Sequence, residues 1–314
     1  MTERVGDIFQ GQVRDMVGDG RGVLSHPSGR TVFVAGVWLG EKVRVKLTQL
    51  KGRSGEGECL EVLEASPDRR QAPCPHHGFA AGDCGACPWQ FVTDSAQQEA
   101  KQARVKHAFA RLACGKQSCE HVVQPLWAAP SPLHYRNRAQ LKTDGQRLGF
   151  LSFQSNTLAE VNACPVLSEK NARTLADLKQ QLPNAQWRPP KRNTFTTLDI
   201  DESVTAESVR VNQRLPFQQA NSAQNARMHD WLRKKLAACD PEHGAVELFC
   251  GSGNLTEVIA EAGFGNITAV EAVAEALTTL QEKNLPGVTA LQADLFGEQG
   301  MDKVAFHTKG AKVL

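Results

Sequence analysis

The sequence predicts a multidomain α/β protein made of three successive parts: residues 1–68, residues 69–212 and residues 213–314. Three observations lead to this division. The first part alternates apolar and polar residues with a period of two, the second carries four cysteines in turn-like contexts, and the third contains a strand, a glycine-rich turn and a helix in succession. At 314 residues, the chain is long enough for each part to bury a core of its own.

The first part is expected to be a small all-β unit. Apolar and polar residues alternate over residues 30–34, 41–47 and 59–63, as in half-buried strands, and turn signals such as Asp19-Gly20 separate them. Short strands this close together lose their free edges by curling, so we expect an oligonucleotide-binding-like (OB-like) barrel over residues 1–68. A generic small barrel that binds no nucleic acid is the alternative for this pattern.

Four cysteines of the second part are candidate metal ligands. Cys84 and Cys87 form a C-x2-C knuckle with Gly85 inside it, which lets two thiolates converge on one metal. Cys74 lies a short way upstream and Cys164 farther downstream, and three of the four cysteines are followed directly by proline, as iron–sulfur ligands often are. Zinc, with the adjacent histidines His76 and His77 completing its shell, is an alternative, and simple burial of the thiols is another.

The remaining cysteines are expected to be structural. The sequence has no signal peptide and an odd count of 9 cysteines, so a disulfide framework is not expected and the protein is expected to be cytoplasmic. No apolar run approaches the length of a membrane span, so no membrane association is expected. We expect small buried side chains at Cys59, Cys114, Cys119 and Cys239.

Basic groups concentrate in the middle of the chain. Residues 71–214 carry 17 Lys+Arg against 12 Asp+Glu, whereas residues 215–314 carry 8 against 12. A helix is expected over residues 96–112 with Thr93 or Asp94 as its cap, and basic side chains that could touch phosphates or only solvate the surface lie along it. The segment 134–138 combines basic groups, an amide and the only tyrosine, which suits base stacking and phosphate contact. A strand whose arginines pair with acids explains it equally well.

The third part is expected to bind a nucleotide-type cofactor. A strand over 246–249, a glycine turn over 250–254 and a helix over 255–262 form a crevice in which the backbone can approach a ligand closely. A second strand ends at Glu271, where a carboxylate can accept both hydroxyls of a ribose, and Asp294 follows a third strand in the same way. Acids at both strand ends and the absence of a G-x-G-x-x-G motif favour S-adenosylmethionine over NAD or a purely structural Rossmann-like unit.

Together these features resemble one family, the RNA uracil-5-methyltransferases that carry a [4Fe–4S] cluster. The sequence from Gly11 to Val23, G-x-V-x-x-M-x-x-D-G-R-G-V, is similar to the opening of a TRAM domain, a barrel that delivers RNA to modifying enzymes. The resemblance covers nearly the whole chain. Its specific motifs are C-G-A-C-P-W-Q (84–90), H-Y-R-N-R (134–138), L-G-F (148–150), C-P-V-L (164–167), F-Q-Q-A-N (217–221) and E-L-F-C-G-S-G-N-L-T (247–256).

The resemblance implies roles for particular residues. It implies an N-terminal TRAM domain, a central iron–sulfur domain, and a C-terminal class I methyltransferase domain that transfers a methyl group from S-adenosylmethionine to C5 of a uridine in rRNA or tRNA. The implied cluster ligands are Cys74, Cys84, Cys87 and Cys164. The implied cofactor-binding residues are Gln219, Phe249, Gly251, Gly253, Asn254, Glu271 and Asp294.

The sequence also departs from that family. Nine residues separate Cys74 from Cys84, which is longer than the family spacing, and neither the S-C-N-P motif of the nucleophile nor the D-P-x-R acidic motif is present. Residues 301–304 are expected to lead into a strand, with His307 near its end and not serving as a base, and residues 307–312 are not expected to form a buried strand. The catalytic residues are therefore unknown, the methyltransferase sheet is expected to be incomplete and its free edge unstable, and activity of the chain is doubtful. A noncatalytic iron–sulfur RNA-binding protein and a redox-responsive switch are the alternatives.

Overall fold

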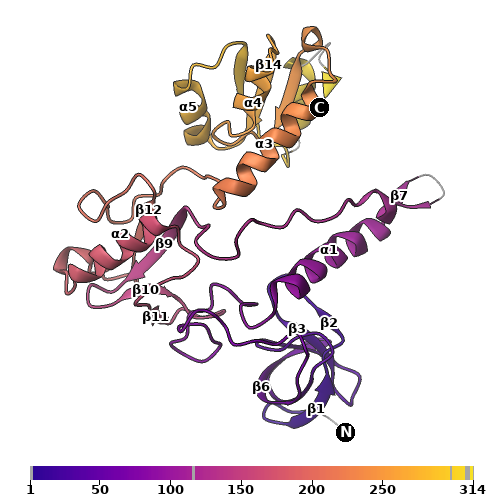
Figure 1. The fold of residues 1–314 in the computed structure, drawn as a ribbon, viewed down its shortest axis with the longest axis vertical. Helices are drawn as coiled ribbons and strands as arrows, with labels where there is room; N and C mark the ends of the chain where they lie inside the picture. The colour runs from indigo at the N-terminus through magenta and orange to yellow at the C-terminus, as the bar shows by residue number, and fades with distance from the viewer. Residues whose placement is uncertain (1–2, 115–116, 298, 308–311, 314) are drawn as a thin grey trace. The chain divides into compact units, whose positions relative to one another are not determined.

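The computed structural model describes residues 3–114, 117–297, 299–307 and 312–313, which form two compact units (Figure 1). The first unit contains Met1–His134 and Gln140–Asn212, so the barrel and the cysteine-bearing part belong to one compact body. The second unit contains Gln213–Leu314 together with the short segment Tyr135–Ala139. No described helix is long and apolar enough to cross a lipid bilayer.

A six-stranded barrel opens the first unit, in the strand order β1-β5-β6-β4-β3-β2. Its strands are β1 (Ile8–Gln12), β2 (Asp15–Met16), β3 (Gly22–Ser25), β4 (Thr31–Val34), β5 (Lys42–Lys51) and β6 (Ser54–Glu64). β1 and β2 are consecutive pieces of one segment; the first pairs with β5 and the second with β3, so the sheet closes on itself. Its interior includes Leu24, Val32, Val43, Val45 and Leu47, all 0% exposed. The three predicted strands and the curled sheet are confirmed.

A buried ion pair fastens the barrel to the segment that follows it. The side chain of Glu41 is 0% exposed and receives two hydrogen bonds from the Arg69 guanidinium, 2.5 and 2.7 Å long. The backbone amides of Trp38 and Ser66 donate to the same carboxylate at 2.8 and 3.3 Å. Because a buried carboxylate is tolerated only when it is paired and hydrogen-bonded, this cluster fixes where the chain leaves the barrel.

The rest of the first unit is an α+β body. Helix α1 (Asp94–Ala110) confirms the helix predicted for residues 96–112; Thr93 is its N-cap residue, but its side chain makes no capping hydrogen bond. A four-stranded sheet in the order β11-β10-β9-β12 follows. Its strands and helix are β9 (Arg138–Thr143), β10 (Leu148–Leu151), β11 (Leu158–Glu160), α2 (Glu169–Gln180) and β12 (Thr196–Asp201). The short elements are β7 (Ala113–Cys114), β8 (Gln117–Ser118), η1 (Cys119–Val122) and η2 (Ala185–Trp187).

One expectation for the structural cysteines is wrong. Cys119 is buried, as expected, but it is disulfide-bonded and is therefore not a simple buried thiol. Cys59 and Cys239 are partly buried and outside any disulfide, and burial raises the pKa of the Cys59 thiol. The side chain of Cys114 lies outside the described residues.

The second unit is a parallel sheet with helices between its strands. The sheet order is β15-β14-β13-β16, and each neighbouring pair runs parallel. The elements are α3 (Ser222–Leu236), η3 (Pro241–His243), β13 (Ala245–Leu248), α4 (Thr256–Glu261), β14 (Ile267–Glu271), α5 (Ala274–Glu282), β15 (Val288–Gln292), α6 (Gly300–His307) and β16 (Lys312–Val313). The three strands and the helix predicted around the glycine turn are confirmed.

The end of the second unit differs from the sequence prediction. Residues 301–304 lie in helix α6 and do not lead into a strand. The helical period places Val304 in the core with Val270 and Leu291, and the Lys303 amine donates to the Gln292 carbonyl at 2.6 Å, which together favour a helix. Of residues 307–312, which are not expected to form a buried strand, Lys312 lies in the two-residue strand β16, which pairs with β13. Residues 308–311 lie outside the described part of the chain.

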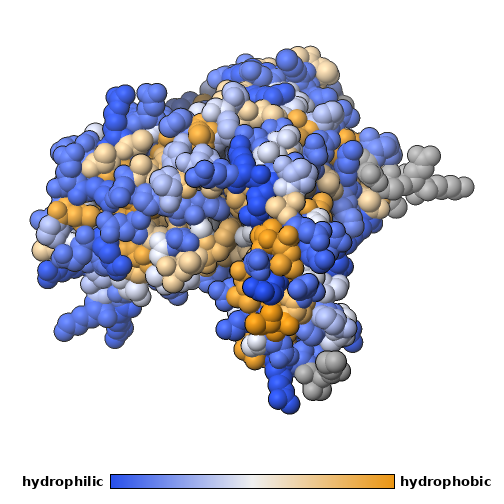
Figure 2. All heavy atoms as spheres, turned by 60° about the horizontal axis from the view of Figure 1, so that its bottom comes forward, coloured by the Kyte–Doolittle hydropathy of each residue, from blue (hydrophilic) through white to orange (hydrophobic). Residues whose placement is uncertain are grey.

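The surface carries several exposed aromatic side chains. Figure 2 shows one face on which hydrophilic side chains predominate and hydrophobic side chains gather in patches between them. Among the large exposed apolar residues of the described chain, Phe217, Phe249 and Phe296 are 77%, 57% and 90% exposed. All three belong to the second unit, which contains the predicted cofactor site.

Candidate functional site

The glycine turn between β13 and α4 forms the centre of the candidate site. The chain leaves β13 with Phe249 at φ +59°, followed by Gly251 at +55° and Gly253 at +88°. At Gly253 a Cβ atom would lie 2.4 Å from Cδ1 of Leu280, so the close approach of α5 requires glycine there. At Gly251 a Cβ atom would meet no heavy atom within 4 Å, so this part of the turn faces open space. The backbone at Gly251 is therefore accessible to a ligand.

The predicted acid at the end of the second strand lies against this turn. Glu271 ends β14, as predicted, and its Oε2 accepts a hydrogen bond from the Gly251 amide at 3.1 Å. Its Oε1 accepts from the amides of Ala272 and Val273 at 2.8 and 3.0 Å. These bonds fix the carboxylate in one orientation, while each oxygen keeps acceptor capacity for a hydroxyl donor.

Asn254 is held by helix α3. Its Oδ1 accepts from Asn225 Nδ2 at 2.9 Å and lies 3.1 Å from the ring nitrogen Nε2 of His229, and its own Nδ2 donates to Asn225 Oδ1 at 2.9 Å. The side chain predicted to contact the cofactor thus joins the turn to α3. Sequence reasoning missed Asn225 and His229, whose spacing of four on a helix places them on one face.

Two titratable groups adjoin the turn, the partly buried Glu247 and the buried Cys250. Burial raises the pKa of the Glu247 carboxyl in β13 to about 7, while the hydroxyl of Thr256 donates to it at 2.6 Å and opposes part of that shift. Cys250 is buried, and burial first and the neighbouring carboxylates second raise the pKa of its thiol to about 12. A thiol of that kind stays protonated near neutral pH, so Cys250 is not a nucleophile. Glu247, an acid within an apolar strand, could have been singled out from the sequence.

Exposed aromatic rings flank the open side of the turn. The rings of Phe249 and Phe296 lie 5.6 Å apart between centroids and are inclined by 38°. Asp294 follows β15, as predicted, and its Oδ1 accepts from the amide of Phe296 at 3.0 Å. The predicted Phe249 and Asp294 therefore come together through Phe296, which sequence reasoning did not single out.

Gln219 is held in place by the segment 135–139, which the sequence suggested for RNA contact or for pairing with acids. The Asn137 amide group donates to the Gln219 carbonyl at 2.9 Å, and the backbone amide of Asn137 donates to the Ala220 carbonyl at 2.9 Å. The Arg138 guanidinium donates to the carbonyls of Leu215, at 2.6 Å, and Pro216. These two side chains therefore brace the loop that carries Gln219.

The cysteine segments of the first unit converge through backbone contacts. The amide of Cys84 donates to the His76 carbonyl at 2.7 Å, and the amide of Asn162 donates to His76 Nε2 at 3.0 Å. A Cβ atom at Gly85 would lie 2.1 Å from the backbone nitrogen of Phe153, so only glycine allows this contact. The segments around Cys74, Cys84 and Cys164 are thus brought together from distant parts of the sequence.

The thiols fit a metal cluster in kind but are not arranged around a metal. Burial raises the pKa of the Cys84 thiol, and the nearby Cys164 and Cys74 raise it further, so these three groups lie within electrostatic reach of one another. None of the four predicted ligands is in a disulfide. Among the described residues, however, no group of three or more His, Cys, Asp or Glu side chains is positioned to hold a metal ion.

The second unit, a parallel sheet with a glycine turn next to an acid at the end of the adjoining strand, has the architecture of a nucleotide-type cofactor-binding domain. No protein-family model matches the chain. The chain is 37% identical over 292 residues to the uncharacterized RNA methyltransferase NE1857 of Nitrosomonas europaea, covering 92% of this chain and 74% of that protein. This chain therefore belongs to the RNA methyltransferase family.

More distant relatives have more specific names. The chain is 28% identical over 350 residues to the 23S rRNA (uracil(1939)-C(5))-methyltransferase RlmD of Halomonas elongata, covering 90% of this chain and 70% of that protein. RlmD of Alkalilimnicola ehrlichii is 30% identical over 276 residues, covering 81% and 60%. Among solved structures, the Pyrococcus abyssi tRNA (uracil-54, C5)-methyltransferase in complex with S-adenosyl-L-homocysteine matches with a TM-score of 0.61 at 15% identity, covering 91% of this chain and 80% of that one. This last match supports the fold alone.

Proposed function

We propose that this protein is an S-adenosylmethionine-dependent RNA methyltransferase that acts on C5 of a uridine in rRNA or tRNA. The observation that carries the proposal is the 3.1 Å hydrogen bond between the Gly251 amide and Glu271, which places a fixed carboxylate beside an open glycine turn. The names of the relatives support both the RNA substrate and the uracil-C5 position. The chain spans 74% of the length of the Nitrosomonas europaea relative and 70% of the length of the Halomonas elongata RlmD. The activity of these longer relatives is therefore only proposed for this chain.

The cofactor is proposed to lie along the open side of the glycine turn. The turn at Gly251 and Gly253 would receive the methionine part, and Glu271 would accept the hydroxyl groups of the ribose. Asp294 and the exposed ring of Phe249 would contact the adenosine part. Gln219 and Asn254, each held by neighbouring side chains, would complete the cofactor-binding set.

Methylation at C5 of uracil imposes chemical requirements. A thiolate must add to C6, the resulting enolate must attack the methyl group of the cofactor, and a base must then remove the C5 proton so that the thiolate can leave. Cys250 is the last cysteine of the sequence, and its buried thiol, 3.6 Å from the Gly251 carbonyl, does not ionise readily. No residue is therefore assigned as the nucleophile.

A [4Fe–4S] cluster is proposed at Cys74, Cys84, Cys87 and Cys164. The proximity of three of these thiols and the absence of disulfides at all four support it. Methyl transfer consumes no electron, so no redox role is proposed for the cluster. Bound there, it would supply a rigid cross-link between the segments that carry the four cysteines. Its proposed role is to organise an RNA-binding surface together with the barrel, which would act as the TRAM domain.

The cluster proposal is tested by anaerobic purification, a visible absorption spectrum, and quantification of iron and sulfide per chain. About four irons with a broad absorption band support the cluster. Zinc or no metal contradicts it. Serine at Cys87 should lower cluster retention and RNA affinity together, and unchanged RNA affinity after loss of the cluster would refute the organising role.

The cofactor and the reaction are tested separately. Isothermal titration of S-adenosylmethionine should show binding that the substitution Glu271→Ala weakens by at least tenfold, because the ribose loses its acceptor. The unaltered chain is then incubated with rRNA or tRNA and S-adenosylmethionine carrying a tritiated methyl group. Label on C5 of uridine supports the reaction. Cofactor and RNA binding without any transfer would instead favour a noncatalytic RNA-binding protein, a role with which the inert Cys250 thiol is consistent.

A further inference from the structure

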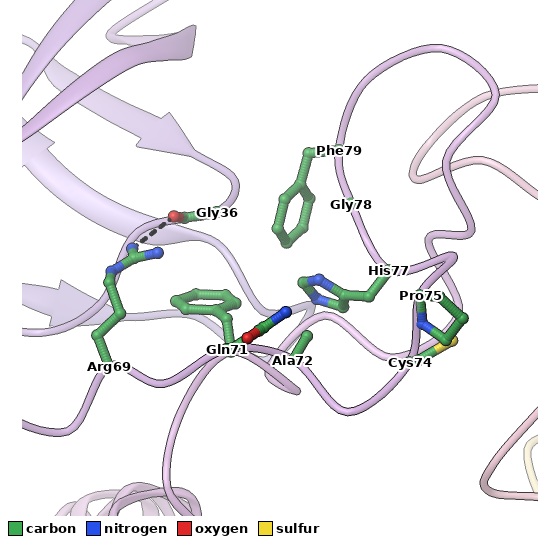
Figure 3. A pocket seen from close by; sticks show the side chains of 10 residues that line it. Gly36, Arg69, Gln71, Ala72, Cys74, Pro75, His77, Gly78 and Phe79 are labelled. Atoms are coloured by element: carbon green, nitrogen blue, oxygen red, sulfur yellow. Dashed lines mark hydrogen bonds between the residues drawn. The ribbon is translucent and has the colours of Figure 1, made fainter.

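The first unit contains a pocket of about 410 Å³ that no part of the proposed methyl transfer uses. It lies between the barrel turn at Gly36 and the segment that carries Arg69 and Phe79 (Figure 3). A Cβ atom at Gly36 would lie 2.9 Å from the Phe79 ring, so the ring can pack here because residue 36 has no side chain. The pocket is thus a built feature of the junction between the barrel and the α+β body.

Aromatic rings form the walls of this pocket. The rings of His77 and Phe79 are 5.3 Å apart and perpendicular, and Phe91 lies 5.9 Å from His77 and 6.0 Å from Phe79. The guanidinium of Arg69 lies over the ring of Phe91 at 4.5 Å. Several planar groups therefore line one space, which suits a flat ligand better than a globular one.

The pocket also offers polar groups to a ligand. The Nε2 atom of His77 is buried and has no hydrogen-bond partner within the described part of the chain. Gln71, an exposed residue, also lines the pocket (Figure 3). Because this nitrogen is unpaired among the described residues, a ligand whose polar edge pairs with it is favoured over a purely apolar one.

The charge in the pocket is already compensated. Arg69 is bound by both carboxylate oxygens of Glu41, at 2.5 and 2.7 Å, and donates to the Gly36 carbonyl at 2.8 Å. The pocket thus offers an anion no unpaired arginine, and a simple phosphate would gain little from it. Cys74, one of the proposed cluster ligands, also lines the pocket.

We propose that this pocket holds one unstacked nucleobase of a single-stranded RNA segment. A nucleobase is flat, has apolar faces for the aromatic walls, and has a polar edge for the His77 nitrogen and the Gln71 amide. The inference rests on the proposed RNA substrate and adds a second point of RNA recognition, in the first unit. The proposed cofactor site belongs to the second unit and shares no residue with this pocket.

The test measures binding of a single-stranded RNA of roughly ten nucleotides that carries one 2-aminopurine and a terminal fluorescein. The substitution Ala72→Phe fills the pocket from its own lining, and Ala81→Phe adds the same ring at an exposed position of the neighbouring loop that does not line the pocket. Gln71→Ala removes only an exposed amide, so it keeps the fold if Ala72→Phe does not. Anisotropy gives the affinity, and 2-aminopurine fluorescence reports whether a base leaves its stack.

The expected result is that Ala72→Phe weakens binding roughly tenfold, which corresponds to about 1.4 kcal/mol, and abolishes the 2-aminopurine change. Gln71→Ala should weaken binding a few-fold, and Ala81→Phe should bind like the unaltered chain. Equal affinity and fluorescence in all variants would overturn the pocket proposal while leaving RNA binding intact, as would equal weakening by Ala72→Phe and Ala81→Phe. Absence of RNA binding by the unaltered chain would overturn this proposal together with the RNA function itself.

Discussion

The glycine turn of the second unit and the cysteine segments of the first unit are both proposed ligand sites, but they are assembled in different ways. The turn is formed by residues within one strand–turn–helix passage, and its acid, Glu271, is 20 residues away from Gly251 on the adjoining strand. The cysteine segments are joined by contacts between distant parts of the chain: Cys84 pairs with His76, and His76 in turn meets Asn162, 86 residues along the chain. The glycine turn needs only its own sheet to form. The arrangement of the cysteines depends in addition on the contacts, here called anchors, that hold distant segments of the first unit together.

Breaking an anchor of the first unit, the buried Glu41–Arg69 pair, is expected to change stability more than any other substitution proposed here. Glu41→Ala should lower the free energy of unfolding of the first unit by about 3–5 kcal/mol, because it leaves the Arg69 guanidinium without its buried partner. Urea unfolding followed by tryptophan fluorescence measures it, since Trp38 bonds to Glu41. Glu61→Ala, which breaks the half-exposed pair with Arg44, is the control and should cost less than about 1 kcal/mol. Similar losses in the two variants would show that the buried pair is not an anchor.

The next largest effect is a pH dependence of stability that comes from the Glu247 carboxyl beside the glycine turn. Burial raises the pKa of Glu247 from its ordinary 4.5 to about 7, so between these values the folded chain holds a proton that the unfolded chain has released. The free energy of unfolding of the second unit should therefore fall as pH rises from about 4.5 to about 7 and level off above, by at most about 3 kcal/mol. Glu247→Gln should remove this fall and be the more stable protein at pH 8.

Urea titrations between pH 5 and pH 8 test this dependence. Glu275→Gln, on the exposed side of α5, removes a carboxyl without burial and should unfold like the unaltered chain at each pH. A slope that survives in Glu247→Gln would mean that another group is responsible.

The two glycines of the turn give a matched pair. Gly253→Ala should destabilise the second unit by about 2 kcal/mol and weaken S-adenosylmethionine binding at least tenfold, because its Cβ would meet Leu280 at 2.4 Å in addition to the strain at φ +88°. Gly251→Ala adds only the strain of a positive φ, in open space, and should cost about 1 kcal/mol. Unfolding and isothermal titration of both variants measure the difference. Equal effects would show that the contact with α5 does not shape the turn.

The smallest effect concerns the loop that carries Gln219. Asn137 is 8% exposed and donates to the Gln219 carbonyl at 2.9 Å and to the Ser222 hydroxyl at 2.7 Å. Asn137→Ala should lower the free energy of unfolding by about 1 kcal/mol and weaken cofactor binding several-fold by releasing the loop. Gln218→Ala, an exposed change in the same loop, is the control. Unchanged cofactor affinity in Asn137→Ala would separate this bracing from the cofactor site.

Sequence patterns predicted the locally coded elements well. The period of two gave the barrel strands, and an apolar run followed by glycines gave the strand, turn and helix, with Glu271 at the end of the next strand. Helix α6 was missed because its pattern is short and weak, and it becomes a helix through the burial of Val304. The bracing of the Gln219 loop by Asn137 and Arg138 was also missed, since its partners are about eighty residues apart and share no periodicity.

The sequence by itself determined the strands of the barrel and the glycine turn between β13 and α4, because hydrophobic periodicity and the conformational freedom of glycine act over a few residues. The tertiary structure decided which distant groups meet: Glu41 with Arg69, His76 with Asn162, and the aromatic walls of the pocket beside Gly36. Such meetings depend on how buried surfaces fit and on satisfying buried polar groups, and these are properties of the folded chain as a whole.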